Sequence, residues 1–133
     1  MVDMAKPRIL IVDDTFVIRQ LLTDMFSKLG LDVVGEAANG NEAVELYMQL
    51  KPDLVTMDII MPLKSGLTAA KEILAIDPGA SIIMCSALGQ EVMVMEAFDV
   101  GIKDFIVKPI MLRDLRNVLS RVLGDKFPSN TSE

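Results

Sequence analysis

The sequence predicts an α/β protein, a single doubly wound parallel sheet of five strands with five helices. Two observations favour this fold class. Short apolar runs alternate along the chain with segments whose apolar residues recur every three to four positions, a pattern typical of a parallel sheet covered by helices on both faces. Four of the runs also end directly on a polar side chain, where ligands of such sheets bind. With 133 residues, the chain suits one domain.

Five segments are expected to form the strands. Four of them are short apolar runs bounded by turn signals, which is typical of strands that are buried in a parallel sheet. In chain order, the expected strands are 8–12, 32–37, 54–57, 82–85 and 105–107.

Helical periodicity fills the segments between these strands. Gly30 is expected to cap the first helix, Asn39 and Gly40 to open the second, and Ser65 and Gly66 to open the third. The last helix is expected to stop near residue 124, so that 1–124 form the domain and 125–133 a short frayed tail. The periodic apolar positions are Ile18, Leu21, Leu22, Met25 and Leu29; Ala43, Val44, Tyr47 and Leu50; Leu67, Ala70, Ile73 and Leu74; and Leu112, Leu115, Val118, Leu119 and Val122.

Charge and composition disfavour several classes of function. The net charge of −6 argues against binding to nucleic acid or to an anionic membrane, since both require a basic surface. The single cysteine, Cys85, excludes an internal disulfide and is expected to be a small core residue. No apolar run approaches the ~18 residues of a membrane span, and the N-terminus lacks the apolar stretch of a signal peptide. A cytoplasmic protein is therefore expected.

Polar side chains stand at the ends of four expected strands. Asp13 and Asp14 follow the first strand, and Asp58 follows the third. Ser86 and Lys108 end the fourth and fifth. Because ligands of open α/β sheets bind outside the carboxyl ends of the strands, we expect these carboxylates, the hydroxyl and the ammonium to converge on one small pocket.

Three carboxylates in one pocket favour a divalent cation. Two carboxylates about 5 Å apart repel by roughly 3 kcal/mol at an effective dielectric constant near 20, and Lys108 supplies the pocket with a single positive charge. Oxygen ligands without histidine or cysteine favour Mg²⁺, with Mn²⁺ as a substitute. A carboxylate can also attack a phosphoryl group, whose oxygens the cation, the lysine and the hydroxyl would bind.

Three stretches of the sequence resemble response-regulator receiver domains almost residue for residue. They are 9–14, 57–62 and 104–109, and with Ser86 they contain the whole polar set. The resemblance covers about 8–123 and is closest to the single-domain chemotaxis regulators of the family. It implies a flavodoxin-like sheet of strand order 2-1-3-4-5, and it implies a phosphorylation-activated signalling switch of a two-component system.

The resemblance also implies a role for each matching acid. Asp58 would accept the phosphoryl group from a phosphohistidine and would contribute to the metal site. Asp14 would bind Mg²⁺ directly and Asp13 through water, while the backbone carbonyl of Ile60 would be a further ligand. Some members carry a polar residue at position 60, so the apolar side chain here bears on the lifetime of the phosphorylated form.

The remaining roles concern the switch itself. Lys108 would pair with Asp58 at rest and with the phosphoryl group afterwards. Ser86 would move toward a phosphoryl oxygen, and the ring of Phe105 would then turn inward behind it. Many chemotaxis members carry tyrosine at this position, so the ring here lacks a hydroxyl for a partner. The resemblance further suggests a cis peptide bond before Pro109.

The partners implied by the resemblance are a CheA-like histidine kinase as donor, a flagellar motor switch protein as target and a CheC- or CheX-like phosphatase. A monomer is expected, with no enzymatic activity beyond its own phosphorylation and slow dephosphorylation. A phosphorelay intermediate that passes the group to another histidine domain is the alternative. A metal-dependent phosphatase is disfavoured, because Ile60 occupies the position two residues after Asp58 where such enzymes need an acid.

Structural interpretations of the same residues stay open at this point. Asp13 and Asp14 could cap the first helix, Asp58 and Lys108 could form a simple buried ion pair, and Ser86 could form a turn.

The segment 90–100 is more apolar than one buried helical stripe requires. Val94, Ala97 and Phe98 are assigned to the core, which leaves other apolar side chains partly exposed. They are Val92, Met93 and Met95. We expect this helix, the Phe105 strand and the last helix to form an output face for a partner, with a deeply buried helix and a core role for Phe105 as alternatives.

Overall fold

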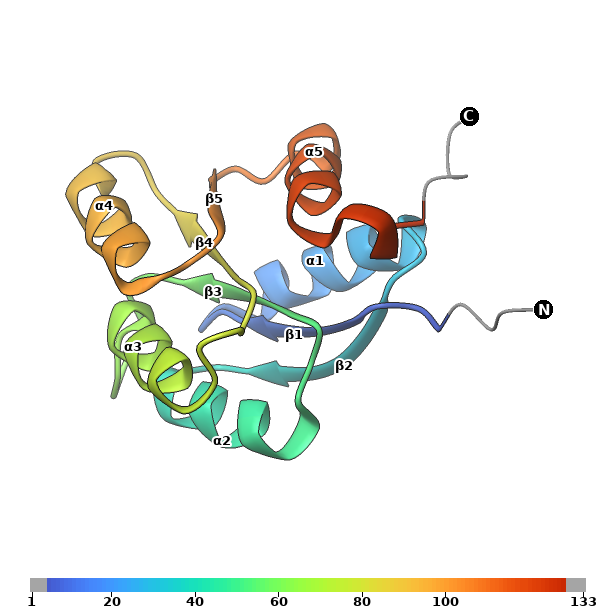
Figure 1. Cartoon of the computed structure of the whole chain (residues 1–133). Helices are drawn as coiled ribbons and strands as arrows, with labels where there is room; N and C mark the ends of the chain where they lie inside the picture. Colours follow the sequence, from blue (N-terminus) through green and yellow to red (C-terminus); the bar gives the residue numbers. More distant parts are fainter. Residues whose placement is uncertain (1–4, 129–133) are drawn as a thin grey trace.

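A five-stranded parallel sheet forms the centre of the protein in the computed structural model, which describes residues 5–128 (Figure 1). The strand order is β2-β1-β3-β4-β5, so both the predicted fold class and the predicted order are confirmed. The strands are β1 (Arg8–Val12), β2 (Asp32–Ala37), β3 (Leu54–Asp58), β4 (Ile82–Ser86) and β5 (Asp104–Val107).

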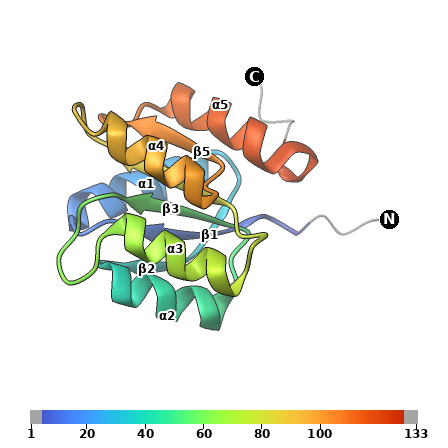
Figure 2. The same ribbon diagram turned by 60° about the vertical axis from the view of Figure 1, so that its left-hand side comes forward.

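Five helices cover the two faces of the sheet. They are α1 (Phe16–Lys28), α2 (Gly40–Leu50), α3 (Gly66–Ile76), α4 (Glu91–Val100) and α5 (Leu112–Leu123). Helices α1 and α5 lie on one face, and α2, α3 and α4 lie on the other (Figures 1 and 2). The sheet therefore separates two apolar cores, one under each set of helices.

Side-chain caps are present at the two helix starts that the sequence predicts at Asn39 and Ser65. The side chain of Asn39 accepts a hydrogen bond from the backbone N–H of Glu42 at 2.9 Å. The Glu42 carboxylate accepts in return from the N–H of Ala38 at 2.8 Å, which is the reciprocal arrangement of a capping box. Ser65 accepts from the N–H of Thr68 at 3.1 Å. These side chains fix where α2 and α3 begin, and so fix the lengths of the preceding loops.

The core differs in detail from the predicted apolar stripes. Leu21 of α1 is 41% exposed, whereas Phe26, which the stripe leaves out, is fully buried. The buried arc of α1 is centred on Leu22 and Phe26, which lie one turn apart and face α5.

The packed part of the chain extends beyond the expected boundary at residue 124. Residues Gly124–Lys126 form a short 3₁₀ helix, and Phe127 is buried in the core beneath α1 and α5. The expected frayed tail is thus wrong for these residues, because the Phe127 ring gains a buried apolar site. The rest of that tail, 129–133, lies outside the described residues.

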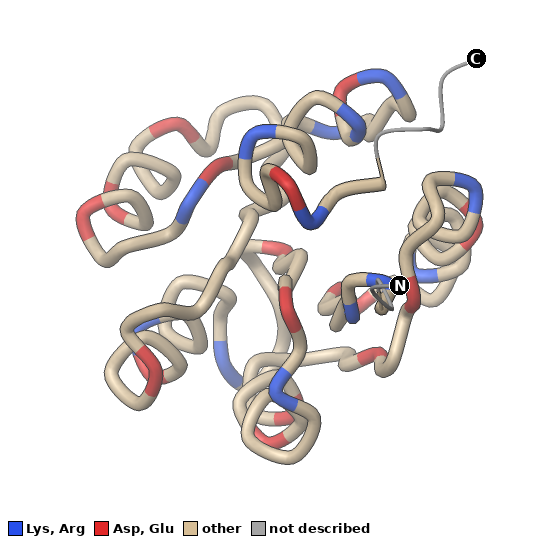
Figure 3. Tube along the Cα trace, turned by 45° about the vertical axis from the view of Figure 1, so that its right-hand side comes forward, with Lys and Arg blue, Asp and Glu red and all other residues tan. Residues whose placement is uncertain are grey.

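Charged residues of both signs are distributed over the surface elements (Figure 3). No face in that view is uniformly basic, which agrees with the net charge of −6. No helix in residues 5–128 combines the length and the hydrophobicity that a membrane crossing requires.

Candidate functional site

Three carboxylates meet at the carboxyl end of the sheet. One ligand oxygen from each of Asp13, Asp14 and Asp58 lies within 4.8 Å of the other two. Asp58 is the last residue of β3, and the two other acids directly follow β1, its neighbour in the sheet. The loops after β1, β3 and β4 lie at this same end (Figure 2). The structure thus brings together the acids that the sequence assigned to one pocket.

Lys108 forms ion pairs with two of these acids. Its Nζ atom lies 3.0 Å from Oδ2 of Asp13 and 3.3 Å from Oδ1 of Asp58. The shorter contact is a hydrogen bond to Asp13, and the longer one joins Asp58, the resting partner that the family resemblance implies. The peptide bond between Lys108 and Pro109 is cis. The ammonium is therefore shared, and an ion pair between Asp58 and Lys108 alone does not describe the site.

Burial and neighbouring charges shift the pKa values of this group. Burial raises the pKa of Asp58, and the negative charge of Asp13 raises it further, while the positive charge of Lys108 opposes both. Burial acts to lower the pKa of Lys108. The hydrogen bond to Asp13 and the charges of Asp58 and Asp13 outweigh that effect, so this pKa lies above its ordinary value. Lys108 consequently stays protonated, and additional positive charge nearby would stabilise the ionised form of Asp58.

Asp13 and Asp14 differ sharply in environment. Asp13 is 1% exposed, and its Oδ1 atom accepts a hydrogen bond from the N–H of Thr15 at 2.8 Å. Asp14 is exposed. The N-cap of α1 is Thr15, whose own side chain makes no capping bond. Neither acid occupies the N-cap position, so the capping interpretation does not account for their placement.

The donor set of the pocket fits a hard divalent cation. The ligand atoms that converge are carboxylate oxygens, and the described residues contain no histidine that could compete. Three negative charges against the single charge of Lys108 leave an excess that a divalent ion would offset. Asp13, Asp14 and Asp58 are the side chains that could hold Mg²⁺ here.

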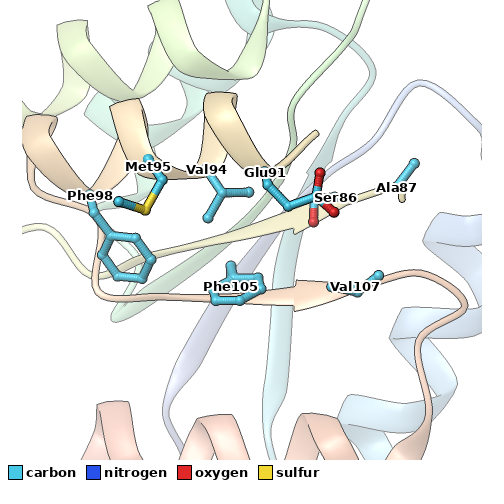
Figure 4. Close-up of a pocket in the computed structure, with 8 residues that line it drawn as sticks. All are labelled: Ser86, Ala87, Glu91, Val94, Met95, Phe98, Phe105 and Val107. Atoms are coloured by element: carbon cyan, nitrogen blue, oxygen red, sulfur yellow. The ribbon is translucent and has the colours of Figure 1, made fainter. Parts of the chain in front are cut away.

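Ser86 lies at the border between the acids and a second, apolar pocket. Its backbone carbonyl accepts a hydrogen bond from the N–H of Lys108 at 2.7 Å. Its side chain lines a pocket of about 180 Å³ between α4 and β5 (Figure 4). Alternation along β4 explains this placement, because Cys85 packs beneath α1 and α5 and the next residue must face α4. Among the described residues, no hydrogen bond joins the Ser86 side chain to the acids.

Two aromatic rings close the other end of this pocket. Phe105 is 38% exposed, and its ring meets that of Phe98 edge to face with centroids 6.0 Å apart (Figure 4). Val94, Met95 and Glu91 complete the α4 wall. The space beside Phe105 is the place into which its ring could turn.

Helix α4 is half buried, so the deeply buried alternative is wrong. Val94 and Ala97 are buried, as assigned, and Val92 and Met95 are 75% and 67% exposed. Phe98, however, is 39% exposed rather than part of the core. Its ring meets that of Phe105, which belongs to β5, the edge strand of the sheet.

Two residues at the site had no chemical role in the sequence-based interpretation. A β-carbon at Gly66 would overlap the carbonyl oxygen of Asp58, so the absence of a side chain there lets α3 begin directly against the site. Arg19 donates to the backbone carbonyl of Asp13 at 2.7 Å. The sequence marks Gly66 as a helix start, but nothing local identifies the carbonyl that Arg19 reaches.

Comparisons with known proteins agree with this geometry. The sequence model of the response regulator receiver domain matches residues 9–120. The chain is 55% identical over 115 residues to the chemotaxis protein CheY of Thermotoga maritima, covering 86% of this chain and 96% of that one. It is 52% identical over 117 residues to CheY of Bacillus subtilis, covering 88% and 98%.

The fold is also similar to those of solved response regulator structures. The fold matches a chain of the CheX–CheY–BeF3–Mg²⁺ complex of Borrelia burgdorferi with a TM-score of 0.84 and 37% identity, covering 87% of this chain and 88% of that one. It matches the response regulator domain of Thermotoga maritima CheB with a TM-score of 0.80 and 37% identity, covering 92% and 97%.

Proposed function

Since this chain belongs to the response regulator receiver domain family, and is a CheY-like, phosphorylation-activated switch, we propose that Asp58 is its phosphoacceptor. The observation that carries the proposal is the convergence of the Asp58 carboxylate with two further acids and a shared lysine at the end of the sheet. A carboxylate so placed is a nucleophile beside the Lys108 cation and within a cluster of oxygens that could hold a metal.

The reaction requires the ionised form of Asp58. One of its oxygens attacks phosphorus, the phosphorus–nitrogen bond of a donor phosphohistidine breaks, and its electron pair returns to the imidazole. Lys108 holds the oxygen and then pairs with the transferred group, so its contacts with Asp13 and Asp58 must loosen. Mg²⁺, bound by Asp13, Asp14, Asp58 and the carbonyl of Ile60, would offset the negative charge that develops on the phosphoryl oxygens.

Ser86 and Phe105 couple this chemistry to the surface. The hydroxyl of Ser86 moves toward a phosphoryl oxygen, which vacates space in the pocket that it lines with Phe105. The Phe105 ring turns into that space and alters the face formed by α4, β5 and α5. The switch is thus a shift between two arrangements of the same side chains, biased by one covalent group.

The partners follow from the likeness to chemotaxis relatives. The donor is a CheA-like histidine kinase, the target is a flagellar motor switch protein, and a CheC- or CheX-like phosphatase resets the switch. The chain acts as a monomer, and it catalyses only its own phosphorylation and slow dephosphorylation, since Ile60 occupies the position two residues after Asp58 where metal-dependent phosphatases need an acid. We expect no multiple-turnover hydrolysis of small phosphoesters.

The test is covalent labelling with acetyl phosphate and Mg²⁺, followed by intact mass. We expect the mass to rise by one phosphoryl group in the wild type and not in Asp58→Asn. Asp24→Asn, which changes an exposed carboxylate on α1, is the matched control and should label normally. Labelling that persists in Asp58→Asn, or that is indifferent to EDTA, would contradict the proposal. Transfer from the labelled chain to a histidine phosphotransfer domain would favour the relay alternative.

A further inference from the structure

Every polar group of Asp13 has a hydrogen-bond partner. Its N–H donates to the carbonyl of Ala37 at 3.0 Å, and its two carboxylate oxygens accept from the N–H of Thr15 at 2.8 Å and from Lys108 at 3.0 Å. The remaining group, the backbone carbonyl, accepts from Nη1 of Arg19 at 2.7 Å. A residue that is 1% exposed and fully bonded is a fixed point of the site.

The guanidinium of Arg19 is itself held by two further neighbours. Its Nε atom donates to the carboxylate of Glu36 at 3.0 Å, and its Cζ atom lies 5.7 Å from the centre of the Phe16 ring. The Arg19 side chain is only 16% exposed. Glu36 belongs to β2, which pairs with β1, so the arginine joins the start of α1 to the sheet beside the site. The planar fork lets one side chain bond two groups at once.

From these contacts we infer that Arg19 is a positioning residue for the metal-binding pair Asp13 and Asp14, acting through the peptide plane between them. The inference rests on the proposed function, since it concerns the Mg²⁺ site of that function. The carbonyl that Arg19 holds belongs to the rigid peptide unit that ends in the nitrogen of Asp14. Fixing that carbonyl therefore fixes the direction in which the chain presents the second carboxylate.

Asp14 depends on this peptide plane more than the other two acids do. The carboxylates of Asp13 and Asp58 each contact Lys108. Within residues 5–128, no hydrogen bond or ion pair holds the carboxylate of Asp14, which is exposed. Its orientation is consequently set by the backbone, and the backbone there is held by the guanidinium.

Substitution of Arg19 changes Mg²⁺ affinity in opposite directions under two explanations, one in which Arg19 positions the ligands and one in which only its charge matters. Arg19 is a cation near a site for another cation, so its charge alone weakens Mg²⁺ binding. If only charge mattered, Arg19→Ala would bind Mg²⁺ more tightly, and Arg19→Lys would bind as the wild type does. Positioning predicts weaker binding in both variants, because lysine is a point charge without the fork that bonds Asp13 and Glu36 together.

The test is the Mg²⁺ dissociation constant of the folded protein, measured by calorimetry with the metal alone. We expect about tenfold weaker binding in Arg19→Ala, in line with the loss of other groups that orient metal ligands. In metal-free protein, the amides of Asp13 and Thr15 should exchange hydrogen faster. Arg8→Ala is the matched control, because Arg8 also donates to backbone carbonyls, those of Leu50 at 2.8 Å and Lys51 at 3.1 Å, but at the opposite end of the sheet.

The outcomes distinguish this inference from the proposed function. A wild type that does not bind Mg²⁺ overturns the proposed metal site itself. A wild type that binds, with Arg19→Lys equal to it, overturns the positioning role and leaves the site intact. Glu36→Gln keeps an oxygen acceptor for Arg19 but removes a negative charge, so positioning predicts nearly unchanged affinity. If Arg19→Ala does not fold, Arg19→Lys alone decides the matter.

Discussion

At the scale of single residues, Gly66 shows how closely the proposed phosphoacceptor is enclosed. The N–H of Gly66 donates to the carbonyl of Ile59 at 2.7 Å, and a β-carbon would overlap the carbonyl oxygen of Asp58. The obstacle is backbone rather than the flexible end of a side chain. Any side chain at position 66 must therefore displace either the first turn of α3 or the residue that accepts the phosphoryl group.

We accordingly expect Gly66→Ala to lower both stability and labelling. Overpacking of this kind costs about 1–3 kcal/mol of unfolding free energy, and the displaced carboxylate should react more slowly with acetyl phosphate. Urea unfolding and the rate of labelling measure the two effects. Gly79→Ala is the control, since a β-carbon there would lie 3.5 Å from the nearest atom, an Asp77 oxygen, in ordinary contact. Equal behaviour of the two variants would show that α3 can shift freely.

At the scale of elements, a hydrogen bond ties α2 to the end of α3. The hydroxyl of Tyr47 donates to Oδ2 of Asp77, the C-cap of α3, at 2.7 Å. Burial raises the pKa of this phenol, and the hydrogen bond to Asp77 and the charges of Asp77 and Asp53 raise it further. The folded protein thus keeps the tyrosine protonated at a pH where the unfolded chain ionises it.

Stability should therefore fall as the pH rises above about 10, the ordinary pKa of tyrosine. Above that value the unfolded chain binds fewer protons than the folded one, so the free energy of unfolding decreases with pH, by up to about 1.4 kcal/mol per pH unit for this group. Tyr47 is the chain's single tyrosine, and there is no tryptophan, so absorbance at the tyrosinate band reports it directly. We expect that band to appear with unfolding and not before.

Tyr47→Phe provides the comparison for this pH effect. The variant should be less stable at neutral pH by about 1 kcal/mol, because it loses the hydrogen bond. It should also lack the part of the alkaline decline that the phenol causes. A wild type that titrates near the ordinary tyrosine pKa while still folded would contradict this account.

Helix α4 carries four exposed large apolar side chains next to the pocket, those of Val92, Met93, Met95 and Phe98. Met95 is 67% exposed and also lines the pocket beside Phe98 and Phe105. A soft, flexible side chain in this position suits contact with a partner. Its place at the border of the pocket connects the proposed output face to the ring that is expected to turn.

Met95→Ser should weaken target binding several-fold and leave phosphorylation unchanged, because the residue lies away from the acids. The measurement is binding of the beryllofluoride-activated protein to a peptide of the motor switch protein, alongside the labelling rate. Met93→Ser, on the same helix but outside the pocket lining, should have a smaller effect. Met48→Ser on α2 is the matched control, since Met48 is a 44% exposed methionine on another helix. Equal affinity of the Met95 and Met48 variants would remove α4 from the proposed interface.

At the scale of the whole molecule, the fold and the acid cluster could be predicted because their signals are local. Four of the five strands are marked by a short apolar run, and the site acids stand at the ends of two of these runs. What could not be predicted depends on pairs far apart in the chain. The sharing of Lys108 between Asp13 and Asp58, the overlap at Gly66 and the burial of Phe127 all arise from how separate elements pack.

Phe98 shows the same limit on one helix. Helical spacing puts it on the inner face with Val94, but spacing cannot say where the sheet ends. Because β5 is the edge strand, the Phe98 ring lies beside Phe105 at the surface, while Ala97 in the same turn is buried in the core.

Stability of the whole molecule should depend on Mg²⁺. A ligand that binds only the folded state adds about 1.4 kcal/mol at a tenfold excess over its dissociation constant. In EDTA, Asp58→Asn should unfold at higher urea than the wild type, because burial and the charge of Asp13 raise the pKa of Asp58 and so disfavour its charged form. Added Mg²⁺ should reduce the difference in urea midpoint between the two proteins, because it stabilises the wild type, whose three carboxylates bind it. A variant less stable than the wild type in EDTA would contradict the balance of charges described here.

The acids and the proposed output pocket border each other at the carboxyl end of β4, although the side chains that line them leave the strands on different faces of the sheet. Asp58 pairs in register with Cys85, whose side chain packs on the α1 and α5 side, whereas the Ser86 side chain lies on the α4 side. A change at the acids, such as phosphorylation of Asp58, must therefore affect the α4 pocket through the residues at the end of β4. The carbonyl of Ser86 already bonds the N–H of Lys108 there. A small molecule bound in the α4 pocket against Ser86 would therefore be separated from Lys108 by a single backbone hydrogen bond. By shifting Lys108, it would change the reactivity of the acids without contacting them.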